Sequence, residues 1–215
     1  MTDPRVFIPA NTVVTSATLI PEIKLHLATE VVPLWQATEA DLAATGLPPP
    51  YWAFAWPGGQ AIARHVLDTP RLVAGRRVLD LAAGCGIAAI AAAKSGAHMA
   101  SASEIDRFAL AAIVLNARLN DVVVTALDRD VLDEAPGDWD TVLAGDLCYE
   151  RPMADRVAIW IKAQARAGVT VLMGDPGRAY KPADGLAEVA RYVVPTSRDL
   201  EDRDTRETIV WRVLG

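Results

Sequence analysis

From residue 76 onward, short apolar runs alternate with longer segments whose apolar residues recur every three or four positions. The short runs predict five buried β-strands, and the longer segments predict helices after the first, second and fourth strands. Residues 186–190 then predict a short helix, and residues 192–195 and 208–213 predict a final pair of strands. The five strands are expected at residues 78–81, 98–103, 122–127, 141–144 and 169–173, and the helices at residues 87–95, 107–119 and 154–165.

This alternation implies an α/β class: a doubly wound, mostly parallel, seven-stranded sheet with helices on both faces. We expect a short N-terminal extension at residues 1–50 and a single α/β domain at residues 51–215. A helix over residues 60–67 would precede the first strand. Within the extension, residues 19–27 predict a strand or short helix and residues 39–45 a short helix. In such a fold, ligands bind outside the carboxyl ends of the strands.

Composition narrows the classes of function. A chain of 215 residues with 52% hydrophobic residues is large enough for one domain with a sizeable core. Its two cysteines fit a reducing cytosol rather than a disulfide scaffold. A net charge of −6 argues against a large nucleic-acid footprint, and no apolar run reaches the length of a membrane span. We therefore expect a cytoplasmic monomer without nucleic-acid or membrane partners.

The first candidate site follows the strand at residues 78–81. Asp80 lies near the strand end, Gly84 and Gly86 form a turn, and an alanine-rich helix follows. Residues 84–89 fit the G-x-G-x-x-A dinucleotide fingerprint, and Glu104 lies where an acid would bind a ribose. A dinucleotide-binding oxidoreductase is therefore one interpretation. However, Asp80 would repel a pyrophosphate, because like charges repel at short range.

S-adenosylmethionine (AdoMet) fits this pattern better. Asp80 can accept a hydrogen bond from its ammonium, Glu104 can bind both ribose hydroxyls, and Asp130 can accept from the adenine amine. Plainer interpretations exist as well. Asp80 could bond to local backbone N–H groups, and Asp128 competes with Asp130 for the adenine. Asp106 is expected to cap the helix at residues 107–119, and Cys85 to be a small turn residue rather than a nucleophile.

A second candidate site follows the strand at residues 141–144. There Asp146 and Tyr149 place a carboxylate and an aromatic ring at the mouth of the sheet. A carboxylate can hold a lysine ε-amine in line for methyl transfer, and an aromatic face favours a cationic methylated product. In the structural alternative, Asp146 caps the helix after Pro152 and Tyr149 lies in the core. No His or Cys cluster has metal-ligand spacing.

These motifs carry a resemblance that spans the chain from residue 19 to the final strand. The sequence resembles the seven-β-strand methyltransferases of family 16, and within them the electron transfer flavoprotein β-subunit lysine methyltransferases, especially the bacterial members. The glycine motif alone is common to many methyltransferases, whereas the combination is much more specific. The resemblance rests on residues 21–25 (PEIKL), 50–60 (PYWAFAWPGGQ), 80–86 (DLAAGCG), 146–149 (DLCY) and 174–178 (GDPGR).

The resemblance implies roles for individual residues. Asp146 and Tyr149 match the element associated with the methyl-accepting lysine. Trp56 matches a tryptophan that lines the AdoMet pocket. Gly84 and Gly86 match the glycine loop. Glu104 stands where relatives often have Asp, and Asp130 where some have Asn; S-adenosyl-L-homocysteine would be the product.

The resemblance also implies the acceptor. The family methylates lysines of the electron transfer flavoprotein β subunit, and bacterial members are associated with ribosomal protein L7/L12. A ribosomal protein L11-type methyltransferase is the nearest alternative, and a non-catalytic AdoMet-binding module is another. The absence of a transit peptide favours a bacterial cytoplasmic form. The charged segment at residues 198–204 is expected to be a solvated hairpin.

Overall fold

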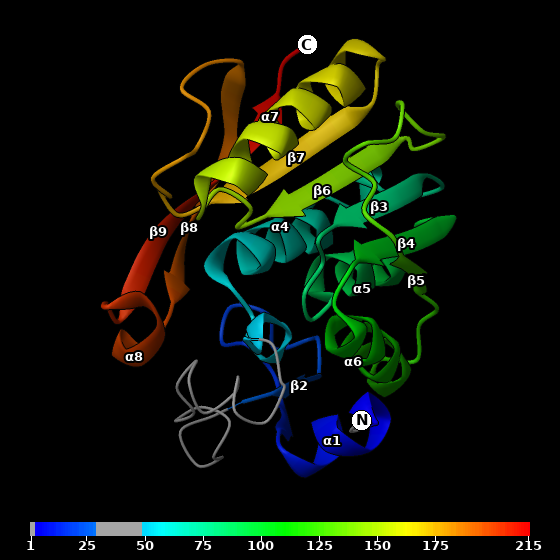
Figure 1. Cartoon of the computed structure of the whole chain (residues 1–215), viewed down its shortest axis with the longest axis vertical. Helices are drawn as coiled ribbons and strands as arrows, with labels where there is room; N and C mark the ends of the chain where they lie inside the picture. The colour runs from blue at the N-terminus through cyan, green and yellow to red at the C-terminus, as the bar shows by residue number, and fades with distance from the viewer. Residues whose placement is uncertain (1–2, 29–48) are drawn as a thin grey trace.

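The computed structural model describes residues 3–28 and 49–215. Its centre is a seven-stranded sheet in the order β5-β4-β3-β6-β7-β9-β8 (Figure 1). The first five strands in this order are parallel, whereas β9 pairs antiparallel with both β7 and β8. The predicted doubly wound, mostly parallel fold is confirmed. The strands are β3 (Arg77–Leu81), β4 (Met99–Glu104), β5 (Thr125–Asp128), β6 (Thr141–Gly145), β7 (Thr170–Asp175), β8 (Leu186–Pro195) and β9 (Thr205–Val213).

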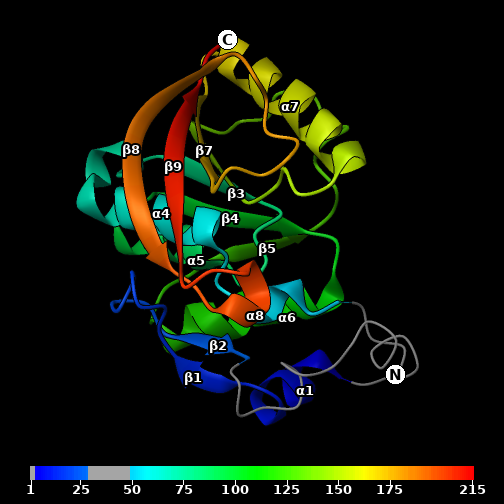
Figure 2. The same cartoon turned by 90° about the vertical axis from the view of Figure 1, so that its left-hand side faces the viewer.

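Helices cover both faces of this sheet, and side chains alternate between the two faces along each strand. Val78 and Leu143 point into the core under α4, α5 and α6, whereas Leu79 and Val142 point into the core under α7. Figures 1 and 2 show α7 on its own across the sheet from α4 and α5. The helices are α4 (Pro57–Asp68), α5 (Ile87–Lys94), α6 (Arg107–Leu119) and α7 (Arg151–Arg166).

Helices α5 and α6 both begin after a residue that suits a helix start. The Asp106 carboxylate accepts from the N–H of Phe108 at 2.8 Å, so the predicted cap of α6 is confirmed. Helix α5 starts at Gly86, whose φ of 77° is left-handed. A Cβ at Gly86 would lie 3.1 Å from Cγ1 of Ile113, so α6 also packs closely there. Gly86 thereby lets the chain leave β3 and enter a buried helix.

The N-terminal segment packs on α6 beyond the sheet. Helix α1 (Pro4–Ala10) is followed by the short hairpin of β1 (Val13–Thr15) and β2 (Leu25–Leu27). Asn116 of α6 accepts from the His26 N–H at 2.8 Å, which ties β2 to the domain. Residues 19–27 thus contain a strand only at their end. The helix expected at residues 39–45 lies outside the described residues.

One predicted element is wrong. Residues 186–190 form the first part of β8 rather than a helix, and β8 pairs with β9 along its whole length. The alanines there favour a helix locally, but pairing with a long neighbouring strand overrides that preference. A bulge between Glu188 and Ala190 disturbs the alternation that would have indicated a strand.

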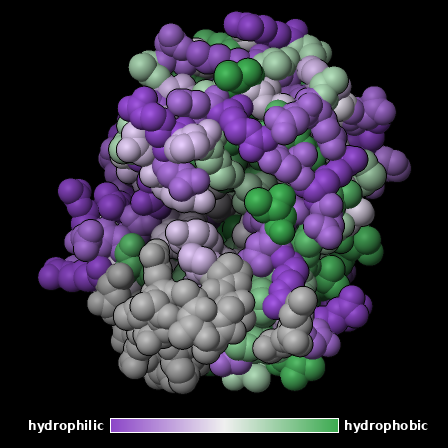
Figure 3. Space-filling model, in the orientation of Figure 1, coloured by the Kyte–Doolittle hydropathy of each residue, from purple (hydrophilic) through white to green (hydrophobic). Residues whose placement is uncertain are grey.

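The surface is mostly hydrophilic on the face shown in Figure 3, with hydrophobic side chains scattered singly or in small groups. Three short helices complete the described chain: η1 (Tyr51–Ala53), η2 (Pro70–Leu72) and α8 (Arg198–Glu201). Among the residues that the structure describes, no helix is both long enough and apolar enough to cross a membrane.

Candidate active site

A cavity of about 270 Å³ opens at the carboxyl ends of β3, β4 and β5, next to the start of α7. This is the edge of the sheet where the fold class places its ligands. Glu104 and Asp130 line it, whereas Asp128 does not. The rest of the lining is largely apolar, with charged groups at the rim: Leu81, Ala82, Ser103, Ile105, Arg129, Val131, Leu132, Glu150, Pro152, Met153 and Arg156.

The glycine loop is connected to the cavity through Glu104. One oxygen of Glu104 accepts from the Gly84 N–H at 2.8 Å, and the other accepts from the Ile105 N–H at 3.1 Å. Burial raises the pKa of this carboxyl above its usual value, although the backbone bonds oppose the shift. Gly84 and Ala82 both have positive φ, at 54° and 46°. Such backbone strain in a non-glycine residue such as Ala82 is typical of ligand sites.

Asp80 lies beneath this loop, in the buried part of β3. Its Oδ2 accepts from the N–H of Ala89 in the first turn of α5 at 2.9 Å. The plainer interpretation, a bond to nearby backbone, therefore describes the ligand-free geometry. Burial raises the pKa of Asp80 to about 8, against the bond from Ala89 and with a further increase from Glu104. A cation placed beside it would reverse much of this shift.

Asp130 lines the cavity, and two contacts fix its carboxylate. One oxygen accepts from the Leu132 N–H at 2.9 Å, and the other forms an ion pair with Arg156 at 2.9 Å. The Arg156 guanidinium also pairs with Asp133. An adenine amine at Asp130 would therefore meet a carboxylate whose position is already fixed.

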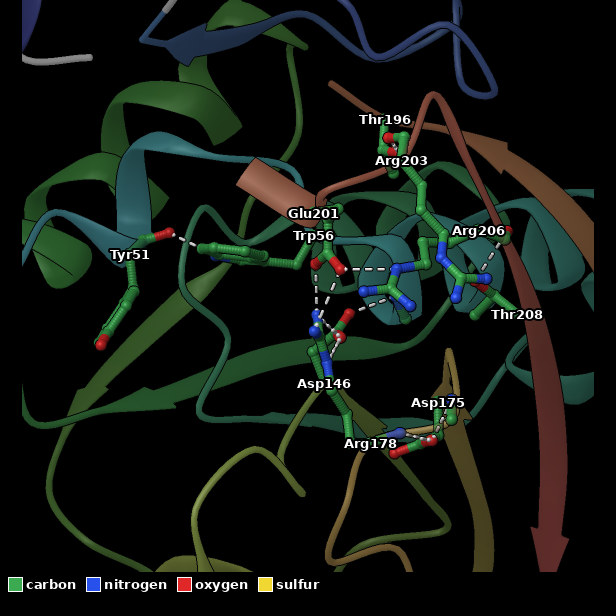
Figure 4. A network of polar contacts seen from close by, with 12 residues as sticks. Tyr51, Trp56, Asp146, Asp175, Arg178, Thr196, Glu201, Arg203, Arg206 and Thr208 are labelled. Atoms are coloured by element: carbon green, nitrogen blue, oxygen red, sulfur yellow. Dashed lines mark hydrogen bonds and ion pairs between the residues drawn. The ribbon is translucent and has the colours of Figure 1, made fainter. Parts of the chain in front are cut away.

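Three aromatic residues connect the cavity side of the site with β6. The Tyr51 ring lies 6.1 Å from the ring of Trp56 and 5.8 Å from that of Tyr149. The Trp56 indole donates to the Tyr51 carbonyl at 2.9 Å (Figure 4). Tyr149 is 44% exposed, so it lies at the mouth and not in the core. Burial and the neighbouring Glu150, Tyr51 and Glu104 raise the pKa of its phenol.

Asp146 directly follows β6 and has a left-handed backbone conformation, with φ of 59°. Its Oδ2 accepts from the Gly58 N–H at the start of α4, not from α7 as the structural alternative required. Its Oδ1 accepts from Nε and Nη2 of Arg178 at 2.9 and 2.6 Å. Burial raises the pKa of Asp146 to about 6, although Arg178 opposes the shift. A carboxylate at a helix N-terminus is favourably placed in the helix dipole.

Sequence comparison decides the family. A relative from Xenopus laevis, described as an electron transfer flavoprotein beta subunit lysine methyltransferase, is 38% identical over 216 aligned positions. The alignment covers 98% of this chain and 87% of the relative. The chain belongs to this family. The resemblance expected from the sequence motifs, from residue 19 to the final strand, is thus confirmed.

Three further comparisons also find methyltransferases. The model of the ribosomal protein L11 methyltransferase (PrmA) family matches residues 64–148. An L11 methyltransferase from Wolinella succinogenes is 31% identical over 50% of this chain and 38% of its own length. Among solved structures, the Synechocystis magnesium protoporphyrin IX methyltransferase with bound SAH superposes with a TM-score of 0.54 at 17% identity, over 73% of this chain and 81% of that one. The fold is therefore shared with this methyltransferase, and the family membership shown by the Xenopus laevis relative decides against the oxidoreductase interpretation.

Within this family fold, the structure brings the predicted residues together in two groups. Glu104, Gly84 and Asp80 are connected through the glycine loop, and Asp130 lines the cavity together with Glu104, whereas Gly84 and Asp80 do not line it. A separate group surrounds Asp146. Tyr51, Arg178 and Glu201 also contact these residues, although no role was predicted for them. Tyr51 and Arg178 lie in the motifs at residues 50–60 and 174–178, and Glu201 lies in the charged segment.

The charged segment at residues 198–204 divides into two parts. Arg198 and Asp204 pair in solvent, with 75% and 69% of their side chains exposed, as expected for a solvated hairpin. Glu201, however, is 3% exposed, and its side chain accepts from Arg178 and Arg206. The expectation is wrong for Glu201, which binds the arginine that holds Asp146.

Proposed function

We propose that this chain transfers methyl groups from AdoMet to lysine ε-amines of the electron transfer flavoprotein β subunit. The observation that carries the proposal is the 38% identity over 98% of the chain to lysine methyltransferases of that subunit. The geometry adds an arrangement suited to the reaction. A largely apolar cavity with carboxylates in its lining, a cluster of aromatic rings and the buried Asp146 carboxylate all lie at the carboxyl ends of the central strands.

The cavity residues fit AdoMet. Glu104 would bind the ribose hydroxyls, and Asp130 would accept from the adenine amine at the opposite wall. The apolar lining, which includes Val131 and Met153, suits a flat heterocycle. Asp80 would accept from the ammonium, while Gly84 and Gly86 leave room for the backbone to approach the ligand. Trp56 would face the cofactor from the aromatic cluster.

The acceptor side must present a neutral amine in line with the methyl group. A lysine is protonated at neutral pH, with an unperturbed pKa of about 10.4, so its ε-ammonium is first attracted to a carboxylate. Asp146 would hold that nitrogen, and Tyr149 would pack along the apolar stem. The proton leaves to water before transfer. Bound AdoMet would supply the methyl group, whose bond to sulfur breaks as its bond to the amine nitrogen forms.

Substrate choice within this chemistry is part of the proposal. The β subunit of the flavoprotein is the first acceptor, and ribosomal protein L7/L12 is a second, in a bacterial cytoplasm. The L11-type alternative is less favoured, because the L11 methyltransferase match spans only 38% of that relative's length.

The test is methyl transfer from labelled AdoMet to purified acceptors offered separately: the flavoprotein β subunit, L7/L12 and L11. We expect label on the β subunit with the wild-type enzyme, and little or none with the Asp146→Asn variant. Label on L11 alone would refute the acceptor. Calorimetry with AdoMet and NAD complements the assay, and AdoMet binding without transfer to any protein of a bacterial lysate would favour a non-catalytic module.

A further inference from the structure

The guanidinium of Arg178 lies between two buried carboxylates. It donates to Asp146 at 2.9 and 2.6 Å, and to Glu201 at 3.2 and 2.5 Å (Figure 4). Arg178 follows β7, and Glu201 belongs to α8, at the turn between β8 and β9. The C-terminal hairpin is therefore tied to the end of β6 through one side chain.

This network is shielded from water. The Glu201 side chain is 2% exposed, and those of Asp146 and Arg178 are 8% and 19% exposed. Arg206 of β9 gives Glu201 a second positive partner at 2.9 Å. Two carboxylates and two guanidiniums thus balance in charge, which is what a buried ionic cluster requires.

The cluster leaves no free oxygen on Asp146. Gly58 donates to Oδ2, and Arg178 donates twice to Oδ1. Oδ1 already accepts two hydrogen bonds from Arg178, so a substrate ammonium that binds Oδ1 has to displace the guanidinium. Glu201 already binds Nη1 and Nη2 of the same guanidinium, so Arg178 would keep a negative partner if it withdrew from Asp146.

We propose that Arg178 is a shared counter-ion of Asp146 and Glu201, which positions the Asp146 carboxylate and withdraws toward Glu201 when a substrate ammonium arrives. This inference rests on the proposed function, because that function supplies the ammonium. Arg178 and Glu201 are positioning residues that act through Asp146. They are assigned to lysine capture and not to AdoMet binding.

The charges around Asp146 make this assignment testable. Arg178 faces it from the loop after β7, and Glu201 from α8, with Arg206 of β9 behind Glu201. Helix α4 contributes the Gly58 N–H. Asp175 at the end of β7, Cys148 on the loop after β6 and Lys181 on the loop after β7 are further titratable groups on this side. The negative charges of Asp175 and Asp146 raise the pKa of Cys148 beyond the effect of burial, whereas Lys181 lowers it.

Two substitutions should move the titration of Asp146 in opposite directions. Arg178→Met removes the positive partner, so the Asp146 carboxyl should titrate at higher pH than in the wild type. Glu201→Gln removes a negative neighbour and keeps a hydrogen-bond acceptor, so Asp146 should titrate at lower pH. Carbon-13 NMR of the carboxyl groups measures both, with the Asp146 signal assigned by its loss in Asp146→Asn.

Controls separate this role from general support of the hairpin. Arg191→Met removes ion pairs with Glu188 and Glu207 on the same β8–β9 hairpin and should leave the titration of Asp146 unchanged. Should Arg178→Met fail to fold, Arg178→Lys retains the charge and should restore most of the wild-type titration.

Kinetics provide the second measurement. In Glu201→Gln the guanidinium stays on Asp146, so KM for the acceptor protein should rise several-fold while the AdoMet affinity stays at the wild-type value. In Arg178→Met, kcat/KM at pH 7 should fall about 10-fold or more, as for loss of one charged hydrogen bond. Shifts in the same direction, or no shift in either variant, would overturn the counter-ion role. If the wild type does not methylate the β subunit, the proposed function fails, but the titrations still test the counter-ion.

Discussion

Binding of AdoMet should release the proton that buried Asp80 carries in the ligand-free protein. Burial raises the pKa of Asp80 to about 8, and its carboxyl accepts a hydrogen bond from the Ala89 N–H. At pH 7 a group with that pKa is about 90% protonated. An ammonium beside the carboxylate favours its ionised form and so lowers the pKa.

The size of the effect follows from these values. If binding brings the pKa of Asp80 well below 7, about 0.9 proton is released per AdoMet bound at pH 7. The ligand's own α-amino group, with a pKa near 7.7–8.0, is already mostly charged and takes up only about 0.1 proton. Because binding releases nearly one proton, the affinity for AdoMet should increase almost tenfold as the pH rises from 6 to 7.

Calorimetry measures this proton directly. Titrations of AdoMet at pH 7 in buffers of different ionisation enthalpy give the number of protons released from the slope of heat against that enthalpy. Asp80→Asn keeps the oxygen that accepts from Ala89 but cannot ionise, so the release should disappear. Affinity should also fall about 10-fold or more, because a charged hydrogen bond is lost.

Two results would refute this reasoning. Equal proton release by the wild type and Asp80→Asn would show that the proton comes from elsewhere, with Glu104 the next group to examine. Unchanged AdoMet affinity in Asp80→Asn would remove Asp80 from the cofactor site and leave it the structural role that its bond to Ala89 describes.

Three other substitutions, and Gly59→Ala as a control for one of them, test further residues of the site. Glu104→Ala should weaken AdoMet binding about 10-fold, because a bidentate charged contact is lost; unaltered affinity in calorimetry would contradict the ribose role. Asp146→Asn should bind AdoMet with wild-type affinity but lose methyl transfer, and unchanged turnover would exclude Asp146. Gly58→Ala should lower the free energy of unfolding by about 1–3 kcal/mol or more in urea titrations, because its Cβ would lie 2.7 Å from the Asp146 nitrogen. Gly59→Ala, with its nearest atom at 3.3 Å, should cost less, and equal losses would refute this close packing.

Local patterns were sufficient for most of the fold. The periodicity of residues 107–119 and the acid before them gave both the helix α6 and its cap at Asp106. The alanine-rich start of β8 led to a wrong prediction of a helix, because its conformation is set by pairing with β9, which comes later in the chain. Local preference therefore failed where a non-local strand pairing decides the structure.

The candidate site divides in the same way. Asp80, Gly84 and Glu104 lie within one strand–helix–strand unit, so spacing alone could place them near one another. The partners of Asp146 could not be found that way. Arg178 lies 32 positions after Asp146 in the sequence, and Glu201 lies a further 23 positions on. Glu201 belongs to a segment of charged residues, and such a composition predicts side chains exposed to solvent. Only the folded hairpin brings that carboxylate into the interior.

Methylation of a lysine in the electron transfer flavoprotein β subunit is the function proposed for this chain. Mass spectrometry of that subunit, incubated with AdoMet and the enzyme, tests it most directly, with Asp146→Asn as the matched control. The account predicts one or more added methyl groups on a lysine in the wild-type reaction and none in the control. An unmodified subunit, under conditions where the enzyme binds AdoMet, would contradict it.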